Sequence, residues 1–323
     1  MKVMKYPAKE EWGKLVERPH LDVSQLNATV EGVLNDVKNN GDAAVKHYEE
    51  KFDHAHLSAL AVTEAEIEEA EGLISPELKH ALELAHHNIA TFHQSQKFEG
   101  EKVETAPGVT CWQKSVAIEK VGLYIPGGTA PLFSTVLMLA TPAKIAGCKE
   151  IVLCTPPNAE GKVNPAILMA AKIAGVSKIF KAGGVQAIGA MAYGTESVPK
   201  VYKIFGPGNQ YVMAAKQHVS LHDVAIDMPA GPSEVCVIAD ETSNPVFVAA
   251  DLLSQAEHGL DSQVFLISTS EYIIEKVQAE VARQLAVLPR LAMATKSLDN
   301  SKFVLVHDYD EAIQLSNTYA PEH

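Results

Sequence analysis

The sequence predicts an α/β fold with two domains, each built on mainly parallel sheets flanked by helices, one domain inserted into the other. From about residue 109 onward, short apolar runs alternate with helical stretches. Because parallel strands are joined by crossover connections, this alternation favours parallel sheets with helices on both faces. Glycine-containing turns follow several of the apolar runs. The chain has 323 residues, which is enough for about two domains.

The first part of the chain, residues 21–97, is predicted to be helical because its apolar residues recur at spacings of three and four. Thr63 with Glu66 forms a candidate capping box. Ser75 followed by Pro76 is a candidate helix start, with proline at the first helical position. We interpret this region as scaffold.

The rest of the chain is predicted to alternate between strands and helices. Residues 109–113 and 116–124 show the alternating pattern that is typical of strands. The further strands that we expect are 150–154, 178–181, 201–205, 234–239, 263–268 and 302–306. The helices that we expect between them include 131–146, 164–174, 186–193 and 209–219.

Composition excludes several classes of function. The chain has 27 basic and 40 acidic residues, a formal net charge of -13, which disfavours nucleic acid as a partner and suits a cationic small molecule. No apolar stretch is long enough to span a bilayer, and the first residues lack the apolar core of a signal peptide, so we expect no membrane contact and a cytoplasmic location. The four cysteines are too scattered for a disulfide framework and are expected to be buried free thiols.

Three glycine-containing turns follow predicted strands, at residues 124–131, 182–186 and 205–209. In open α/β sheets, ligands bind beyond the carboxyl ends of the strands, so three such turns suggest a shared crevice. The alternative for each turn is that its glycines merely end a strand. No Gly-x-Gly-x-x-Gly fingerprint and no Walker phosphate loop is present, so the fold is expected to be an incomplete, Rossmann-like one.

Polar side chains beside these turns are candidates to bind a dinucleotide. They are Tyr124, Gln186 and Asn209. Each could instead cap a helix. The order of the elements suggests an N-terminal segment (1–20), an outer domain (21–123 plus 234–323) and an inserted, nucleotide-binding-like domain (124–233).

Gln255 and His258 are a candidate metal-binding pair. They stand three apart in a stretch expected to be helical, so an amide oxygen and an imidazole would leave the same face. A divalent metal could take both, although zinc wants about four ligands and two residues are not a complete site. The alternative is a polar helix face.

The last residues, Glu322 and His323, place a carboxylate beside an imidazole, and an acid/base pair at the very end of a chain looks like a cut. Ser233 is the exposed hydroxyl of a proline-rich link. No Gly-x-Ser-x-Gly elbow or adjacent base accompanies it, so we expect it to hydrogen-bond a substrate rather than act as a nucleophile.

The chain resembles the histidinol dehydrogenase family over nearly its whole length, most densely from Val121 to Gln263. The phrases that carry the resemblance are Val-Gly-Leu-Tyr-Ile-Pro-Gly-Gly, Ala-Pro-Leu-Phe-Ser-Thr-Val-Leu-Met-Leu-Ala-Thr-Pro-Ala, Lys-Ile-Phe-Gly-Pro-Gly-Asn, Met-Pro-Ala-Gly-Pro-Ser-Glu and Asp-Leu-Leu-Ser-Gln-Ala-Glu-His-Gly. The resemblance implies an enzyme that oxidises L-histidinol through L-histidinaldehyde to L-histidine, the last step of histidine biosynthesis, with two hydride transfers to NAD. It also implies a homodimer.

The resemblance further implies roles for the candidate residues. Tyr124, Gln186 and Asn209 correspond to NAD contacts, and Ser233 to a substrate contact. The remaining candidates are Gln255 and His258, which correspond to zinc ligands that also touch substrate, and Glu322 and His323, which correspond to the catalytic pair. In the family, the counterpart of His323 accepts the alcohol proton and also contacts substrate, and that of Glu322 activates the attacking water. Oxidising a primary alcohol to an acid needs two such bases and a clamp on the aldehyde.

The chain departs from the family because members run past the Pro-Glu-His motif and draw an aspartate and a histidine zinc ligand from that later part. We therefore expect this chain to be a truncated form with weakened or absent zinc binding and little turnover. Two alternatives stay open: a related zinc- and NAD-dependent dehydrogenase for another small alcohol, and a non-catalytic NAD-binding homologue. Activity on L-histidinol against short diols would test the first alternative, and mass spectrometry of the native protein or the reading frame beyond codon 323 would test the second.

Overall fold

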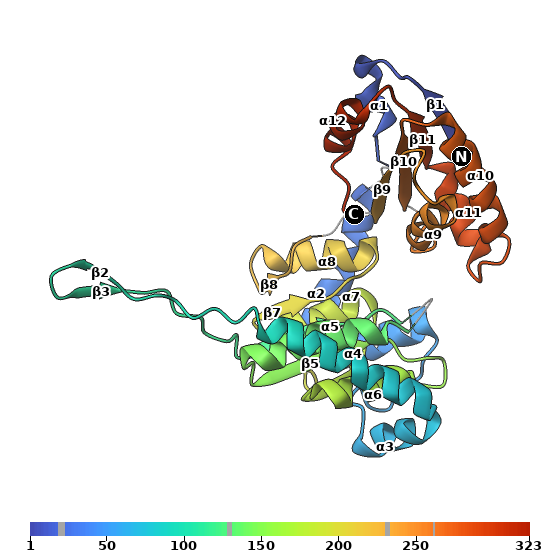
Figure 1. Cartoon of the computed structure of the whole chain (residues 1–323). Helices are drawn as coiled ribbons and strands as arrows, with labels where there is room; N and C mark the ends of the chain where they lie inside the picture. The colour runs from blue at the N-terminus through green and yellow to red at the C-terminus, as the bar shows by residue number, and fades with distance from the viewer. Residues whose placement is uncertain (19–22, 128–130, 230–232, 261) are drawn as a thin grey trace. The chain divides into compact units, whose positions relative to one another are not determined.

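The structure is a computed structural model of residues 1–323, and it describes residues 1–18, 23–127, 131–229, 233–260 and 262–323. The chain divides into two compact units, Met1–Leu21 with Ala230–His323 (unit 1) and Asp22–Pro229 (unit 2) (Figure 1). Both units are α/β with parallel sheets flanked by helices, which confirms the predicted fold class. None of the helices among the described residues is long and apolar enough to cross a membrane.

Unit 2 is built on a parallel sheet with the strand order β6-β5-β4-β7-β8. The strands are β4 (Lys120–Tyr124), β5 (Glu150–Thr155), β6 (Lys178–Lys181), β7 (Lys203–Phe205) and β8 (Ala225–Ile226). The chain enters at β4, adds β5 and β6 on one side, and then returns to add β7 and β8 on the other. The carboxyl end of β4 is therefore the point at which the strand order reverses, where open α/β sheets bind ligands.

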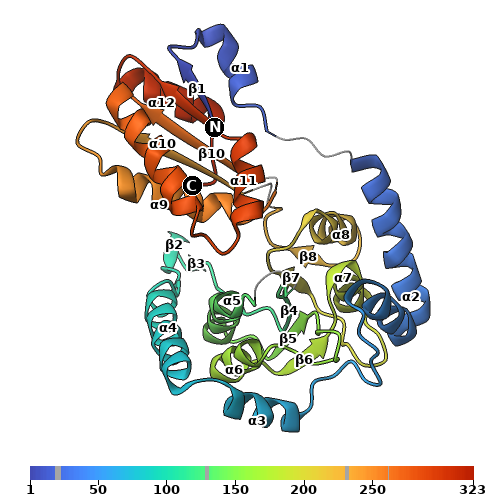
Figure 2. The ribbon, with the colours of Figure 1, turned by 90° about the vertical axis from the view of Figure 1, so that its right-hand side faces the viewer.

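Seven helices of the described part of unit 2 cover the two faces of this sheet (Figure 2). Helices α2 (Val23–Asp53), α7 (Gly184–Tyr193) and α8 (Gln210–Ser220) form one apolar core with the sheet, and α3 (Glu64–Leu73), α4 (Pro76–Gln94), α5 (Phe133–Ala146) and α6 (Pro165–Ala174) form another. The predicted capping box is confirmed, since Glu66 N–H donates to Thr63 Oγ1 at 3.3 Å. Ser75 caps α4 as predicted.

An antiparallel hairpin of β2 (Val103–Ala106) and β3 (Val109–Cys111) projects from unit 2 (Figure 1). The sequence predicted strands at 109–113 and 116–124, but the structure has only 109–111 and 120–124 as strands there. The alternating pattern at residues 109–113 does not mark a buried strand face, because every residue of β2 and β3 is exposed.

Unit 1 is built on a second parallel sheet, with the order β1-β11-β10-β9. Its strands are β1 (Lys2–Lys5), β9 (Glu234–Ala239), β10 (Gln263–Ser268) and β11 (Lys302–Leu305). Helices α9 (Pro245–Ala256), α10 (Glu271–Leu285) and α11 (Leu291–Asp299) pack on one face of this sheet. Helices α1 (Trp12–Leu15) and α12 (Tyr309–Tyr319) pack on the other. A short 3-10 helix, η1 (Lys9–Glu11), directly precedes α1.

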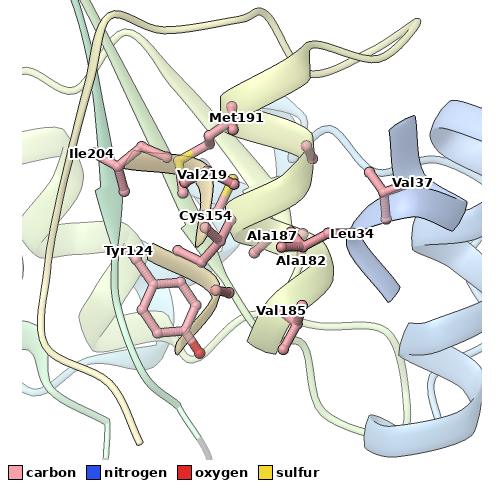
Figure 3. Packing of buried hydrophobic residues seen from close by; sticks show 14 of the residues in the cluster. Leu34, Val37, Tyr124, Cys154, Ala182, Val185, Ala187, Met191, Ile204 and Val219 are labelled. Atoms are coloured by element: carbon pink, nitrogen blue, oxygen red, sulfur yellow. The ribbon is translucent and has the colours of Figure 1, made fainter. Parts of the chain in front are cut away.

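The predicted domain boundaries need correction. The inserted arrangement is present, but residues 22–123 group with the inserted unit and not with the outer one. The reason is burial: Leu34 and Val37 of α2 are fully buried in one core with α7 (Figure 3). A Cβ on Gly189 of α7 would lie 3.2 Å from Leu34 and 3.3 Å from Val37, so the two helices are in close contact. The predicted separate segment 1–20 is also corrected, because β1 forms the edge of the sheet in unit 1.

Candidate active site

Tyr124 ends β4, and its ring lies in the core of unit 2 with 4% of its surface exposed (Figure 3). The N–H of Gly184, at the start of α7, donates to the Tyr124 hydroxyl oxygen at 3.1 Å. Burial raises the pKa of the Tyr124 phenol, so it stays protonated and keeps an O–H to donate. A hydrogen bond thus joins the end of the central strand β4 to the glycine turn after β6.

Gln186 lies in the first turn of α7 and is almost fully buried, with 1% of its surface exposed. Its side-chain nitrogen donates to Glu49 Oε1 at 2.7 Å, and the N–H of Gly183 donates to the same oxygen at 2.8 Å. Burial, and to a smaller extent neighbouring Asp53, raise the pKa of Glu49 to about 7, although the two hydrogen bonds lower it. Gln186 is therefore held by the protein, and its Oε1 has no hydrogen-bond partner among the described residues.

Asn209 caps α8, since its Oδ1 accepts from the N–H groups of Tyr211 and Val212 at 3.0 and 3.1 Å. The capping role that the sequence left open is thus present. The Asn209 side chain is exposed, and its Nδ2 makes no hydrogen bond to any residue in the described ranges. A donor at the start of a helix is therefore available to a ligand.

The glycine turn before Asn209 is pressed against the end of β4. A Cβ on Gly206 would lie 2.1 Å from the carbonyl oxygen of Tyr124, and Gly206 has φ 137°, so only glycine suits this position. Two charged residues hold the turn: Asp227 accepts from Gly206 N–H at 2.8 Å, and buried Lys216 donates to Gly206 O at 2.7 Å. Lys216 and Asp227 also form an ion pair. The turns after β4, β6 and β7 therefore meet at one sheet edge.

A cavity of about 460 Å³ opens at the same edge, after β4 and β5. Its walls include Gly127, Pro156, Asn158 and Asp53. A Cβ on Gly183 would lie 2.7 Å from Pro156 Cβ, so the α7 turn packs directly against the cavity wall. The volume suits a small-molecule ligand. Tyr124, Gln186 and Asn209 are not among its lining residues.

Sequence reasoning missed Glu49 and Asp53, which α2 brings to this edge. The sequence does carry a signal for Glu49. It stands four residues after Val45, which is fully buried, so the two side chains lie on the same buried face of the helix. An acidic residue on an apolar stripe is buried only if it has partners, so this position was open to prediction.

In unit 1, the predicted shared helix face of Gln255 and His258 is wrong. Helix α9 ends at Ala256, so Gln255 is helical and buried while His258 lies in the following turn and is exposed. The two are still linked, because His258 N–H donates to the Gln255 carbonyl oxygen at 3.1 Å. Within the described ranges, no group of three or more His, Cys, Asp or Glu side chains could hold a metal ion.

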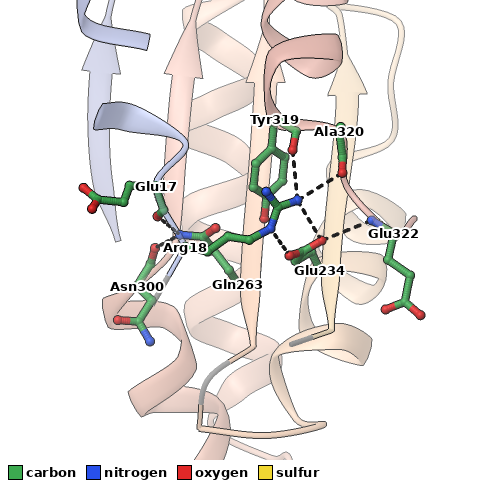
Figure 4. Close-up of polar contacts among 8 residues, drawn as sticks. All are labelled: Glu17, Arg18, Glu234, Gln263, Asn300, Tyr319, Ala320 and Glu322. Atoms are coloured by element: carbon green, nitrogen blue, oxygen red, sulfur yellow. Dashed lines mark hydrogen bonds and ion pairs between the residues drawn. The ribbon is translucent and has the colours of Figure 1, made fainter. Parts of the chain in front are cut away.

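Glu322 and His323 lie along the outer edge of β9. His323 N–H donates to Glu234 O at 3.2 Å, and Cys236 N–H donates to His323 O at 2.9 Å, the pattern of a parallel ladder. The side chains of Glu322 and His323 are exposed, and that of Glu322 points away from Glu234 (Figure 4). Half-buried Ser233 directly precedes β9, so the substrate candidate and the acid/base pair meet at one end of this strand.

Comparisons with known proteins found matches that cover the whole of this chain. A family profile for histidinol dehydrogenase matches residues 16–323. The chain belongs to the histidinol dehydrogenase family. The histidinol dehydrogenase of Bacteroides thetaiotaomicron is 70% identical over 323 residues, which is all of this chain and 76% of that protein. A Bacteroides fragilis histidinol dehydrogenase is 68% identical over the same length. The crystal structure of histidinol dehydrogenase from Elizabethkingia anophelis matches with a TM-score of 0.96 at 52% identity, covering 100% of this chain and 75% of that one.

Within this histidinol dehydrogenase family member, the candidate residues fall into two sets, one in each unit. Tyr124, Gln186 and Asn209 lie in unit 2, where three strand ends and a cavity meet. The other set lies in unit 1 and comprises Ser233, Gln255, His258, Glu322 and His323. The chain spans about three quarters of the length of the relatives that it matches.

Proposed function

We propose that this member of the histidinol dehydrogenase family oxidises L-histidinol through L-histidinaldehyde to L-histidine with NAD as the hydride acceptor. The observation that carries the proposal is the match along residues 16–323, with 70% identity to a histidinol dehydrogenase over the whole chain. The reaction would be the last step of histidine biosynthesis. Net charge of -13 favours a cationic amino alcohol. A homodimer in the cytoplasm is part of the proposal.

The sheet edge of unit 2 fits a dinucleotide. Helix α7 starts at a glycine with no capping side chain, and helix starts favour anions such as phosphate. The N–H groups of Gly183 and Gly184 already donate to Glu49 and Tyr124, so a phosphate would have to use the N–H groups that follow them. Asn209 Nδ2 is a donor that the described residues leave unused. Gln186 Oε1 is a buried acceptor without a donor in that part of the chain, so a ligand that reaches it would satisfy it. Tyr124 would position this turn through Gly184.

Unit 1 supplies the proposed acid/base chemistry. His323 would accept the alcohol proton of the substrate, and Glu322 would take a proton from the water that adds to the aldehyde carbon. Ser233 would hydrogen-bond the substrate. Two molecules of NAD, bound in turn, would each accept one hydride, and a bound zinc ion would hold the amine and imidazole of the substrate. Gln255 and His258 would hold the metal; their oxygen and nitrogen donors suit zinc, but they are only two of the about four ligands that zinc takes.

The protein from the complete reading frame should reduce NAD in the presence of L-histidinol and release L-histidine. The test is steady-state absorbance of reduced nicotinamide, with product identified by mass spectrometry, and short diols as competing substrates. Activity on the diols with none on L-histidinol would replace this proposal with a dehydrogenase for another small alcohol. NAD binding without turnover of any alcohol would favour a non-catalytic homologue.

Replacing His258 by alanine should lower the zinc affinity of the same protein by about 10- to 100-fold, because the metal loses one of its proposed nitrogen ligands. Competition with a chromophoric chelator measures the dissociation constant. His87→Ala is the matched control, since His87 is an exposed histidine on α4 of unit 2. Unchanged zinc affinity in His258→Ala would remove this residue from the proposed metal site.

A further inference from the structure

Arg18 connects the N-terminal part of unit 1 with the residues just before the acid/base pair (Figure 4). Its guanidinium forms an ion pair with Glu234, with Nε on one carboxylate oxygen and Nη2 at 3.2 Å from the other. The same Nη2 donates to the carbonyl oxygens of Tyr319 and Ala320, at 2.9 and 3.0 Å. The planar Arg18 guanidinium thus binds both the start of β9 and the end of α12.

The helix end that Arg18 holds is a sharp turn. Ala320 has φ 47° and ψ 62°, a left-handed conformation that is unfavourable for alanine. This turn ends α12 and sends the chain toward β9. Carbonyls at a helix end have no partners within the helix, and a cation there is favourable. Arg18 therefore stabilises the turn that leads into Glu322 and His323.

Glu234 carries the connection from Arg18 to the pair itself. Its Oε2 accepts from Glu322 N–H at 3.2 Å, and its carbonyl oxygen accepts from His323 N–H at 3.2 Å. Glu234 is 5% exposed, so its charge depends on Arg18 for compensation. The Arg18 guanidinium also lies 5.1 Å from the centre of the buried Tyr319 ring, which fixes its plane.

We propose that Arg18, acting through Glu234 and the Ala320 turn, is a positioning residue that sets the backbone of the Glu322–His323 pair. The inference rests on the proposed catalytic roles of those two residues. Catalytic groups must be held to within a fraction of an ångström, so releasing this backbone should slow the chemistry more than it weakens binding. Neither Arg18 nor Glu234 needs to touch the substrate.

Arg18→Gln, in the protein from the complete reading frame, should lower kcat for L-histidinol by about 10- to 100-fold while the KM for NAD stays within about twofold. Arg18→Lys should recover part of kcat, because an ammonium can pair with Glu234 but cannot reach the two carbonyls in the same planar geometry. The matched control is Arg283→Gln, which removes an exposed arginine of the same unit from its ion pair with Glu280. We expect wild-type kcat for that control.

Circular dichroism and the melting temperature report the folded fraction of each variant. If Arg18→Gln does not fold, Arg18→Lys and Glu234→Gln decide, since both should fold: kcat should be partly lost in Arg18→Lys and lowered by about 10- to 100-fold in Glu234→Gln. Folded variants with kcat within about twofold of wild type, or activity that merely follows the folded fraction, would overturn the inference. Loss of activity in His323→Asn alongside a fully active Arg18→Gln would reject positioning alone. Wild-type kcat in His323→Asn would reject the proposed role of His323, whereas a wild-type protein that does not oxidise L-histidinol would reject the proposed function.

Discussion

Replacing His323 by asparagine is expected to lower kcat for L-histidinol oxidation by about 100- to 10,000-fold, the range for loss of a general base. Asparagine keeps the polarity and approximate length of the side chain but cannot take up a proton. The fold should survive, because the bonds of residue 323 to β9 are made by its backbone N–H and carbonyl. Steady-state NAD reduction by the protein from the complete reading frame measures the effect.

Two comparisons make this result specific. His307→Asn removes a histidine of the same unit that stacks on Tyr6 at 4.3 Å, and it should leave kcat within about twofold. Glu322→Gln should slow the oxidation of L-histidinaldehyde more than that of L-histidinol, because only the second oxidation consumes water. A His323→Asn enzyme with wild-type kcat, or equal losses in His307→Asn, would contradict the assignment of the base.

The sequence was sufficient for the strands that lie inside the two sheets. The bounds of β6, β9 and β10 agree with the predicted ones, because each is an apolar run that polar or glycine residues terminate locally. The predicted strand 201–205 is shorter in the structure, since Val201 N–H bonds to Met191 of α7 and not to a neighbouring strand. Local composition could not reveal that bond.

The candidate site was predictable as a set of residue types but not as an arrangement. Gln186 is buried because its partner Glu49 comes from a helix 137 residues earlier in the chain. His258 lies beyond α9, where the turn is held by a bond from Arg290 to the carbonyl of Glu257, 33 residues away. The backbones of Glu322 and His323 are held by Glu234, 88 residues earlier than Glu322, and no local pattern in the sequence reveals those bonds. Contacts between distant segments decide each case.

Replacing Glu49 by glutamine is expected to change how the stability of the protein depends on pH. Burial, the largest cause, raises the pKa of Glu49 from 4.5 to about 7, so the folded protein binds this proton more tightly than the unfolded chain does. The contribution of this protonated side chain to the free energy of unfolding is fully present below about pH 4.5 and is lost as pH rises through 7. The total change for this group is on the order of 3 kcal/mol. Urea unfolding at pH 5, 7 and 8.5, followed by circular dichroism, measures it.

Glutamine cannot ionise, yet its side-chain oxygen can still accept the bonds from Gly183 and Gln186. The stability of Glu49→Gln relative to wild type should therefore rise with pH, by up to about 3 kcal/mol between pH 5 and 8.5. The ionisable side chains that interact with Glu49 are Asp53, Tyr124 and Cys154, and none of these groups can carry a positive charge that would cancel the effect. Glu31→Gln, at an exposed position of the same helix, should give a pH profile parallel to wild type. Parallel profiles for Glu49→Gln as well would mean that Glu49 is ionised in the folded protein at pH 5, and that it accepts the bonds from Gly183 and Gln186 as a carboxylate throughout.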